Sequence, residues 1–253
     1  GLKANTVNRR LACLKAVFSV AVDNNMIDIS PIRKVKNLKQ LDDGRIRFLS
    51  EDENKRLRAA MRYRNSELIS TRISANNWRS DRGYEPYVEC QEYQFADHIE
   101  PMVLLALNTG MRRGEIFHLT WQDINLKAGI INVRAINSKS NKGRHIPLNK
   151  EVETVINIWL EQQPKKKWYV FPNKSGNRFT DIKKGWGSVL SQAGIDNFRF
   201  HDLRHDFASQ LVMKGVPLNT VRDLLGHADI ATTLRYAHLA KDHKLDAVLL
   251  LDD

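Results

Sequence analysis

Residues 201–238 read HDLRHDFASQLVMKGVPLNTVRDLLGHADIATTLRYAH, and they hold the most informative group of side chains in the chain. At helical spacing His201, Arg204 and His205 share one face, and apolar residues between and after them face the other way. A Gly-His pair follows, and its histidine lies nine residues before Tyr236. The stretch therefore predicts helices that bring imidazole and guanidinium groups together near a phenol.

The histidine pair in this stretch allows two kinds of chemistry. Two imidazoles four residues apart can bind a metal, and zinc proteases use that spacing. The glutamate that such enzymes need is absent here, and Arg204 between the histidines would repel a cation. A histidine and an arginine on one face suit instead the divided negative charge of a phosphoryl-transfer transition state. We therefore expect neither a metal nor another cofactor.

Tyr236 is a candidate nucleophile only in a cationic setting. A phenol has a pKa of ~10 and reacts poorly unless nearby cations offset its developing charge. Upstream, the sequence TGMRRGE over residues 109–115 predicts a turn that opens a helix, with Arg112 and Glu115 three residues apart. A helix N-terminus beside a guanidinium is a natural phosphate site. Arg113 is an alternative to Arg112, which we prefer because it directly follows Gly-Met.

Residues 129–148 predict a strand, a polar turn and a second strand, because apolar residues alternate on both sides of the turn. Lys139 lies at the predicted tip, where its side chain could reach a phosphate or a leaving oxygen. Lys142 is the alternative, and we prefer Lys139 for its distance from the second strand.

Charge points to a polyanionic partner. The 253 residues include 40 Lys and Arg against 29 Asp and Glu, which gives a net charge of +11. Two cysteines far apart favour a reducing compartment over a disulfide framework. No apolar run approaches the ~18–20 residues that span a bilayer. Nucleic acid is therefore the favoured partner, and a membrane is not expected.

The pattern along the chain divides it into parts. Residues 1–30 are interpreted as a helical segment with a basic face, and residues 31–47 as a basic interdomain linker. Residues 1–49 hold ten basic and four acidic residues, a charge of +6. Residues 48–253 form the second domain, which opens with a capping box at Ser50 and Glu53 and contains an insertion over residues 63–97. We expect a mostly helical fold with a small antiparallel sheet.

The order TGxR, hairpin lysine, HxxR, Gly-His and tyrosine resembles the tyrosine recombinase family, the phage integrases in particular, from about Phe48 to Leu245. The resemblance implies the catalytic domain fold of that family, preceded over residues 1–30 by the C-terminal part of its helical core DNA-binding domain. It also implies a set of catalytic residues: Arg112, Lys139, His201, Arg204, His227 and Tyr236. Tyr236 is then the nucleophile, and Glu115 has a structural part.

The resemblance also implies a function and partners. The function is site-specific DNA recombination or integration through a covalent 3′-phosphotyrosyl intermediate, in the bacterial cytoplasm at the nucleoid. Double-stranded attachment sites, a homotetramer on DNA and accessory bending or directionality factors are the implied partners. The apolar end near Leu245–Leu251 packs either on a neighbouring subunit or on its own domain. Three alternatives remain: a type IB topoisomerase, a non-catalytic DNA-binding regulator and a metal-dependent nuclease.

Overall fold

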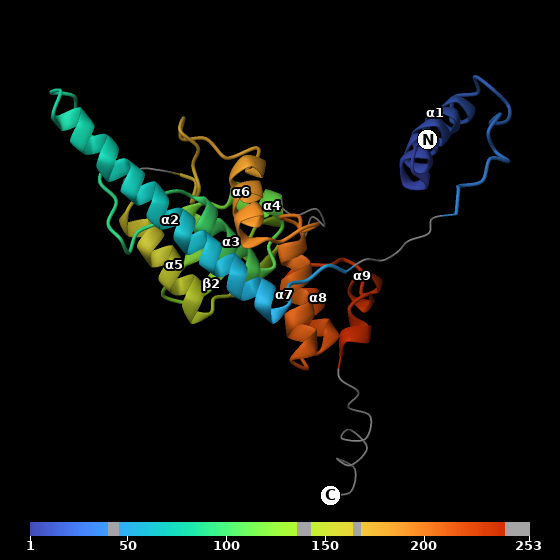
Figure 1. The fold of residues 1–253 in the computed structure, drawn as a ribbon. Helices are drawn as coiled ribbons and strands as arrows, with labels where there is room; N and C mark the ends of the chain where they lie inside the picture. The colour runs from blue at the N-terminus through green and yellow to red at the C-terminus, as the bar shows by residue number, and fades with distance from the viewer. Residues whose placement is uncertain (40–45, 136–142, 164–167, 241–253) are drawn as a thin grey trace, which may run out of the picture. The chain divides into compact units, whose positions relative to one another are not determined.

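The computed structural model describes residues 1–39, 46–135, 143–163 and 168–240 (Figure 1). The chain divides into two compact units, Gly1–Arg45 and Ile46–Asp253. The described residues are mostly helical with a small antiparallel sheet, which confirms the predicted fold class. Within these ranges, no helix combines the length and the apolar character that crossing a membrane requires. The apolar residues near Leu245–Leu251, which are predicted to pack on a neighbouring subunit or on their own domain, lie outside the described ranges.

The first unit is built around helix α1 (Ala4–Asp23), with Lys3 at its N-cap position. The amide of Asn8 donates to the carbonyl of Leu38 and accepts from its N–H, both at 2.8 Å. The basic stretch after α1 therefore folds back along the helix.

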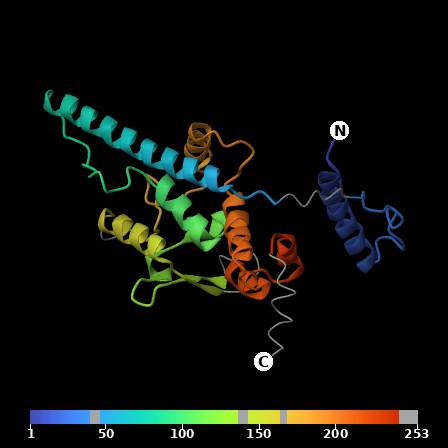
Figure 2. The ribbon, with the colours of Figure 1, turned by 60° about the horizontal axis from the view of Figure 1, so that its bottom comes forward.

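The second unit is a cluster of helices around α3 (Ile99–Thr109), whose side chains are almost all buried. Helix α3 packs against α2, α5 and α7, and α2 also packs along α6. Helix α2 is long, and its C-terminal part extends past the others in both views (Figure 2). The remaining helices are α2 (Glu51–Ser80), α4 (Arg113–His118), α5 (Lys150–Glu161), α6 (Lys183–Ala193), α7 (Asp202–Met213), α8 (Leu218–Leu225), α9 (Ala231–Leu234) and the 3₁₀ turns η1 (Trp121–Asp123) and η3 (Ala237–Leu239).

The sheet contains β1 (Ile124–Asn125), β2 (Ile130–Val133) and β3 (Arg144–Pro147), in that order and all antiparallel. The two predicted strands are confirmed by the pairing of β2 with β3. The tip of this hairpin, with Lys139 and Lys142, lies outside the described residues. In β3, alternate residues are buried, and the guanidinium of Arg144 therefore faces inward beside Ile146.

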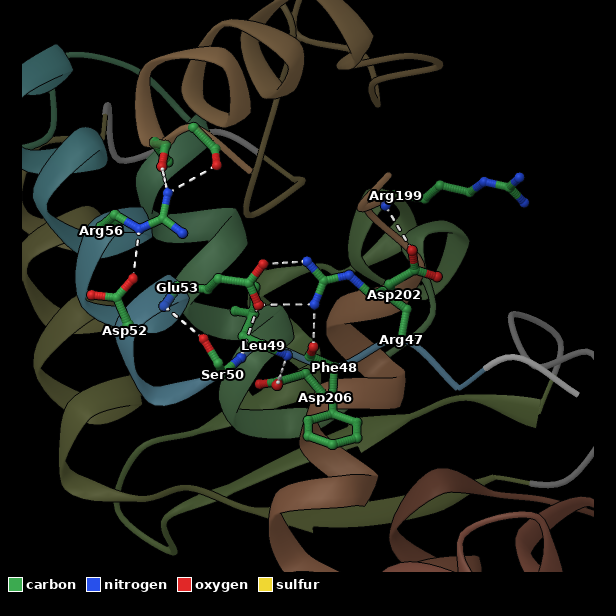
Figure 3. A network of polar contacts seen from close by, with 12 residues as sticks. Arg47, Phe48, Leu49, Ser50, Asp52, Glu53, Arg56, Arg199, Asp202 and Asp206 are labelled. Atoms are coloured by element: carbon green, nitrogen blue, oxygen red, sulfur yellow. Dashed lines mark hydrogen bonds and ion pairs between the residues drawn. The ribbon is translucent and has the colours of Figure 1, made fainter. Parts of the chain in front are cut away.

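The start of α2 is fixed by the predicted capping box, which the structure confirms (Figure 3). Ser50 Oγ accepts from the backbone N–H of Glu53, and the carboxylate of Glu53 accepts from the N–H of Ser50. Arg47 pairs with the same carboxylate. The N–H of Leu49 donates to Asp206 Oδ1 at 2.8 Å, so this segment is also tied to α7. The first residues of the second unit are therefore fixed on both α2 and α7.

Gly110 ends α3 in the left-handed conformation, with φ +61°. A Cβ built there would lie 2.5 Å from Cδ1 of Phe207 and 2.9 Å from Cδ2 of Leu225. Both the backbone conformation and the close approach of α7 and α8 therefore require glycine. This contact brings the ends of three helices to one place.

We expect Gly110→Ala to destabilise the protein more than Gly83→Ala. Gly83 also has a positive φ, of +71°, but a Cβ there meets nothing within 4 Å. Positive φ costs about 1–2 kcal/mol at either site, and overpacking adds about 1–3 kcal/mol at Gly110 alone. Urea denaturation of both variants measures the difference, and equal losses would show that the helix ends are not tightly packed.

Candidate active site

Arg204, on α7, is a buried guanidinium at the meeting point of the helix ends. Its side chain donates to the carbonyl of Gly110 at 2.8 Å and to that of Leu225 at 2.6 Å. Burial, with a further contribution from Arg112, lowers the pKa of Arg204 to about 9, so the group still carries its charge at pH 7. Arg204 therefore joins the C-termini of α3 and α8 and places a positive charge between them.

Glu115, on α4, is the carboxylate of the site, and its side chain is 1% exposed. It accepts from the backbone N–H of Arg112 at 2.8 Å and from Arg112 Nη1 at 2.9 Å. Arg144 donates to both carboxylate oxygens, at 3.0 and 2.7 Å. Burial alone would raise the pKa of Glu115, but the two arginines outweigh it and hold the pKa below its ordinary value. Glu115 is thus ionised and fixes the direction of Arg112.

Arg144 connects this ion pair with the end of α8. Its Nε donates to the carbonyl of Leu224 at 2.8 Å. Gly226, which ends α8 with φ +66°, lies so close that a Cβ there would be 2.8 Å from Cδ of Arg144. His227 directly follows Gly226. Arg144, on β3, therefore fixes the position of the backbone just before this histidine.

The imidazole of His227 lies beside the same cations. Its Nδ1 is 2.8 Å from Thr233 Oγ1, so the first residues of the segment after α8 are tied to α9. Burial, followed by the charges of Arg204 and Arg112, lowers the pKa of His227 to about 3. The ring is therefore neutral at pH 7, and its other nitrogen is left to interact with a ligand.

Tyr236 follows α9 and is 1% exposed. Its hydroxyl lies 2.6 Å from Nδ1 of His205, and its ring packs in the small apolar cluster that includes Val221 and Leu225. Burial raises the pKa of the phenol, while Arg204 and Arg235 favour its ionised form. The phenol is therefore enclosed by α7 and α8 on the side where the guanidinium of Arg204 lies.

A pocket of about 630 Å³ opens beside Arg112 and His201. Further cations and aromatic residues line it, together with one carboxylate. These residues are Arg113, Lys183, Arg199, Trp186, Phe198, Phe200 and Asp181, which pairs with Lys183. Over the described ranges, no group of three or more His, Cys, Asp or Glu side chains is placed to hold a metal ion. The charge around the pocket thus suits an anionic ligand.

The structure brings most of the predicted residues together. Arg112 and Arg204 are joined through Glu115, Arg144 and the end of α8, and His227 follows that end. His201 precedes α7 and meets the ring of His205 edge to face, with 5.3 Å between centroids. Lys139, predicted at the hairpin tip, lies outside the described residues.

Sequence reasoning missed two members of this arrangement, Arg144 and the contact of His205 with the phenol. A signal for Arg144 was available, since it alternates with apolar residues on the inward face of a strand and a buried arginine needs a carboxylate. The partner of Tyr236 had no such signal. His201 and His205 share a helix face, and only the folded position of α9 decides which of them meets the phenol.

The chain matches the model of the phage integrase family over residues 89–243. The integrase of Salmonella phage P22 is 30% identical to it over 96% of this chain and 56% of that protein. The tyrosine recombinase XerD of Listeria monocytogenes serotype 4b is 28% identical over 95% of this chain and 74% of that protein. A post-cleavage complex of the XerH site-specific recombinase with a palindromic difH substrate has a TM-score of 0.67, 22% identity, and coverage of 100% of this chain and 69% of that chain.

The chain belongs to the phage integrase family, since the family model matches more than half of it. The resemblance to tyrosine recombinases is thereby confirmed. The chain spans 56% of the length of the phage P22 protein.

We expect Glu115→Gln to lower the free energy of unfolding at pH 7 by about 3–5 kcal/mol, because the change leaves Arg112 and Arg144 partly or fully buried without a counter-charge. Glu51→Gln is the control, since Glu51 pairs with Lys55 at the surface. Loss of that exposed pair should have little effect on stability, because solvent screens it. Urea denaturation measures the free energy of unfolding of both variants. Similar losses in the two would show that the buried ion pair contributes no more to stability than the exposed one.

The same variant has an expected pH dependence. The pKa of Glu115 is lower in the folded protein than its ordinary value of 4.5. The stabilisation by its charge is therefore complete above pH 4.5 and is lost as the pH falls through the folded pKa. The stability difference between the parent protein and Glu115→Gln should shrink below pH 4.5, and a constant difference down to pH 2 would contradict this.

Proposed function

We propose that this chain is the catalytic part of a site-specific DNA recombinase, which cleaves and rejoins strands through a covalent bond to Tyr236. Family membership supports the class of reaction. The observation that carries the proposal is the enclosure of one phenol by α7 and α8 beside the buried guanidinium of Arg204, with Arg112 held next to it through Glu115. Fixed positive charge of this kind stabilises the negative charge of a phosphoryl-transfer transition state.

The arginines are proposed to hold the phosphate. Arg112 lines the open pocket. Arg204 is held at the ends of α3 and α8 by the carbonyls of Gly110 and Leu225, and a bound phosphodiester is proposed to contact both guanidinium groups. Their hydrogen bonds to the non-bridging oxygens strengthen as charge grows on those oxygens. His227, neutral and fixed through Nδ1, donates from its other nitrogen to a phosphate oxygen. The carbonyls of α3 and α8 fix Arg204, so no energy is spent on ordering it during the reaction.

In the proposed cleavage step, the oxygen of Tyr236 attacks the phosphorus and the bond from phosphorus to the 5′-oxygen breaks. The products are a 3′-phosphotyrosyl bond and a free 5′-hydroxyl. Lys139 is proposed to give a proton to the leaving 5′-oxygen. Attack by a 5′-hydroxyl of another strand reverses the step and releases Tyr236. The covalent bond keeps the energy of the phosphodiester, so exchange needs no ATP.

The proposed partners follow from this reaction. Duplex attachment sites are the substrates, and a homotetramer on two sites is the assembly that exchange of four strands requires. Accessory bending or directionality factors would act on the same DNA. The XerH neighbour is described in complex with its difH substrate, which supports DNA as the ligand of this fold. Strand exchange between two duplexes, as opposed to relaxation of a supercoiled plasmid, distinguishes recombinase from topoisomerase.

We expect the protein to form a covalent adduct with a nicked suicide duplex that carries its attachment site, located by footprinting DNA flanking the gene. Tyr236→Phe removes the attacking oxygen and should give no adduct on a denaturing gel. Tyr63→Phe is the matched control, since Tyr63 is 57% exposed on α2. An adduct that persists in Tyr236→Phe, or none with the parent protein on a bound site, would overturn the proposal.

Adduct formation should be unchanged in excess EDTA. The charges of Arg112 and Arg204 occupy the place that divalent cations take in many phosphoryl-transfer enzymes. The measurement is the single-turnover rate with and without the chelator. A rate that falls at least tenfold and returns with added Mg²⁺ would favour a metal-dependent nuclease.

A further inference from the structure

The hydroxyl of Tyr236 has its hydrogen-bond partner on α7, at His205, and not at His201, which precedes that helix. In the described structure, Nδ1 of His205 lies 2.6 Å from the phenol oxygen. His201 meets the ring of His205 and lines the open pocket. We propose that His205 takes the proton from Tyr236 when the phenol attacks DNA, and this inference rests on the function proposed above.

The backbone of His205 is held firmly on both sides. Its neighbour Arg204 is bound to the carbonyls of Gly110 and Leu225. Its other neighbour, Asp206, accepts from the N–H of Leu49 at 2.8 Å. The imidazole therefore projects from a fixed turn of helix, and the position of its Nδ1 relative to the other side chains of the site varies little. A proton acceptor benefits from this, because proton transfer requires contact at hydrogen-bond distance.

The protonation state of His205 suits the role. To accept the proton of the phenol, Nδ1 must carry none, so the proposed role requires the neutral ring with its proton on Nε2. Burial, followed by the charge of His201, lowers the pKa of His205 to about 4, and the ring is neutral at pH 7. The charged or titratable groups that face it from α7 and from the segments after α8 and α9 are His201, Asp202, Arg204, His227, Arg235 and Tyr236.

The two histidines of the HxxRH stretch then have separate tasks. His201 lines the pocket with Arg112. His205 lies one turn further along α7, between His201 and the phenol. A phosphate bound at the pocket adds negative charge beside His201, whose ring contacts that of His205, and this favours an imidazolium at His205 as the reaction proceeds.

The proton balance of the step is complete. As the bond from the phenol oxygen to phosphorus forms, the hydroxyl proton passes to Nδ1 of His205, and the ring becomes imidazolium. The electron pair of the broken bond goes to the 5′-oxygen, which takes a proton from Lys139 or from water. On rejoining, the imidazolium returns its proton to the phenol oxygen. Because Tyr236 is 1% exposed, DNA must first uncover the phenol, and its proton acceptor is already in contact with it.

The test compares three substitutions in single-turnover cleavage of the suicide duplex. His205→Asn keeps an acceptor oxygen near the place of Nδ1 but cannot take a proton, and His205→Leu removes the acceptor. His145→Asn is the control, because His145 is exposed on β3 and contacts Asn132. We expect both His205 variants to cleave about 10²-fold more slowly and the control to cleave normally. Thermal melting identifies any variant that is unfolded.

Two modified reactants locate the defect. Fluorinated tyrosine at position 236 ionises more readily, and it should restore at least tenfold of the rate lost in His205→Asn. A 5′-bridging phosphorothiolate needs no acid at the leaving group, and it should restore nothing. A His205→Asn rate equal to that of the parent protein, rescue by the phosphorothiolate, or no rescue by fluorotyrosine would overturn the assignment. Failure of the parent protein to form an adduct would instead refute the proposed function.

Discussion

The buried carboxylate of Glu115, bound by Arg112 and Arg144, is the interaction on which the rest of the site depends. Two guanidinium groups drawn from a helix and a strand would repel each other and resist burial without it. With it, Arg112 is aimed at the pocket and Arg144 is free to hold the carbonyl of Leu224. The carboxylate of Glu115 thus orients Arg112 toward the pocket. Through Arg144 it also fixes the position of α8, the helix that precedes His227.

Arg204 extends the same principle without a carboxylate of its own. It is neutralised in part by the negative ends of two helix dipoles, because its hydrogen bonds go to the terminal carbonyls of α3 and α8. Helix ends can approach so closely only where glycine allows it, as at Gly110 and Gly226. The hydrogen bonds of Arg204 go to backbone carbonyls, and Glu115 acts on it only through its charge, so the guanidinium keeps a positive charge that can attract a phosphate.

Much of this arrangement could be predicted from the sequence, because it is local. The capping box at Ser50, the hairpin after Gly129 and the pairing of Arg112 with Glu115 each depend on residues a few positions apart. The rest depends on how distant segments pack. The partner of the phenol is 31 residues away along the chain, and the contact between Arg144 and Leu224 spans 80. The spacing of residues along one helix predicts neither of these two contacts.

The density of cations also determines what the histidines can do. Near Arg204 and Arg112 an imidazolium is disfavoured, and the pKa of His227 falls to about 3. Neutral rings can accept a proton or donate a hydrogen bond, but they add no charge. A bound phosphate reverses this balance, because its negative charge lowers the cost of a second positive group. In the proposed reaction, binding of the phosphate thus raises the basicity of the nearby rings when the phenol must lose its proton.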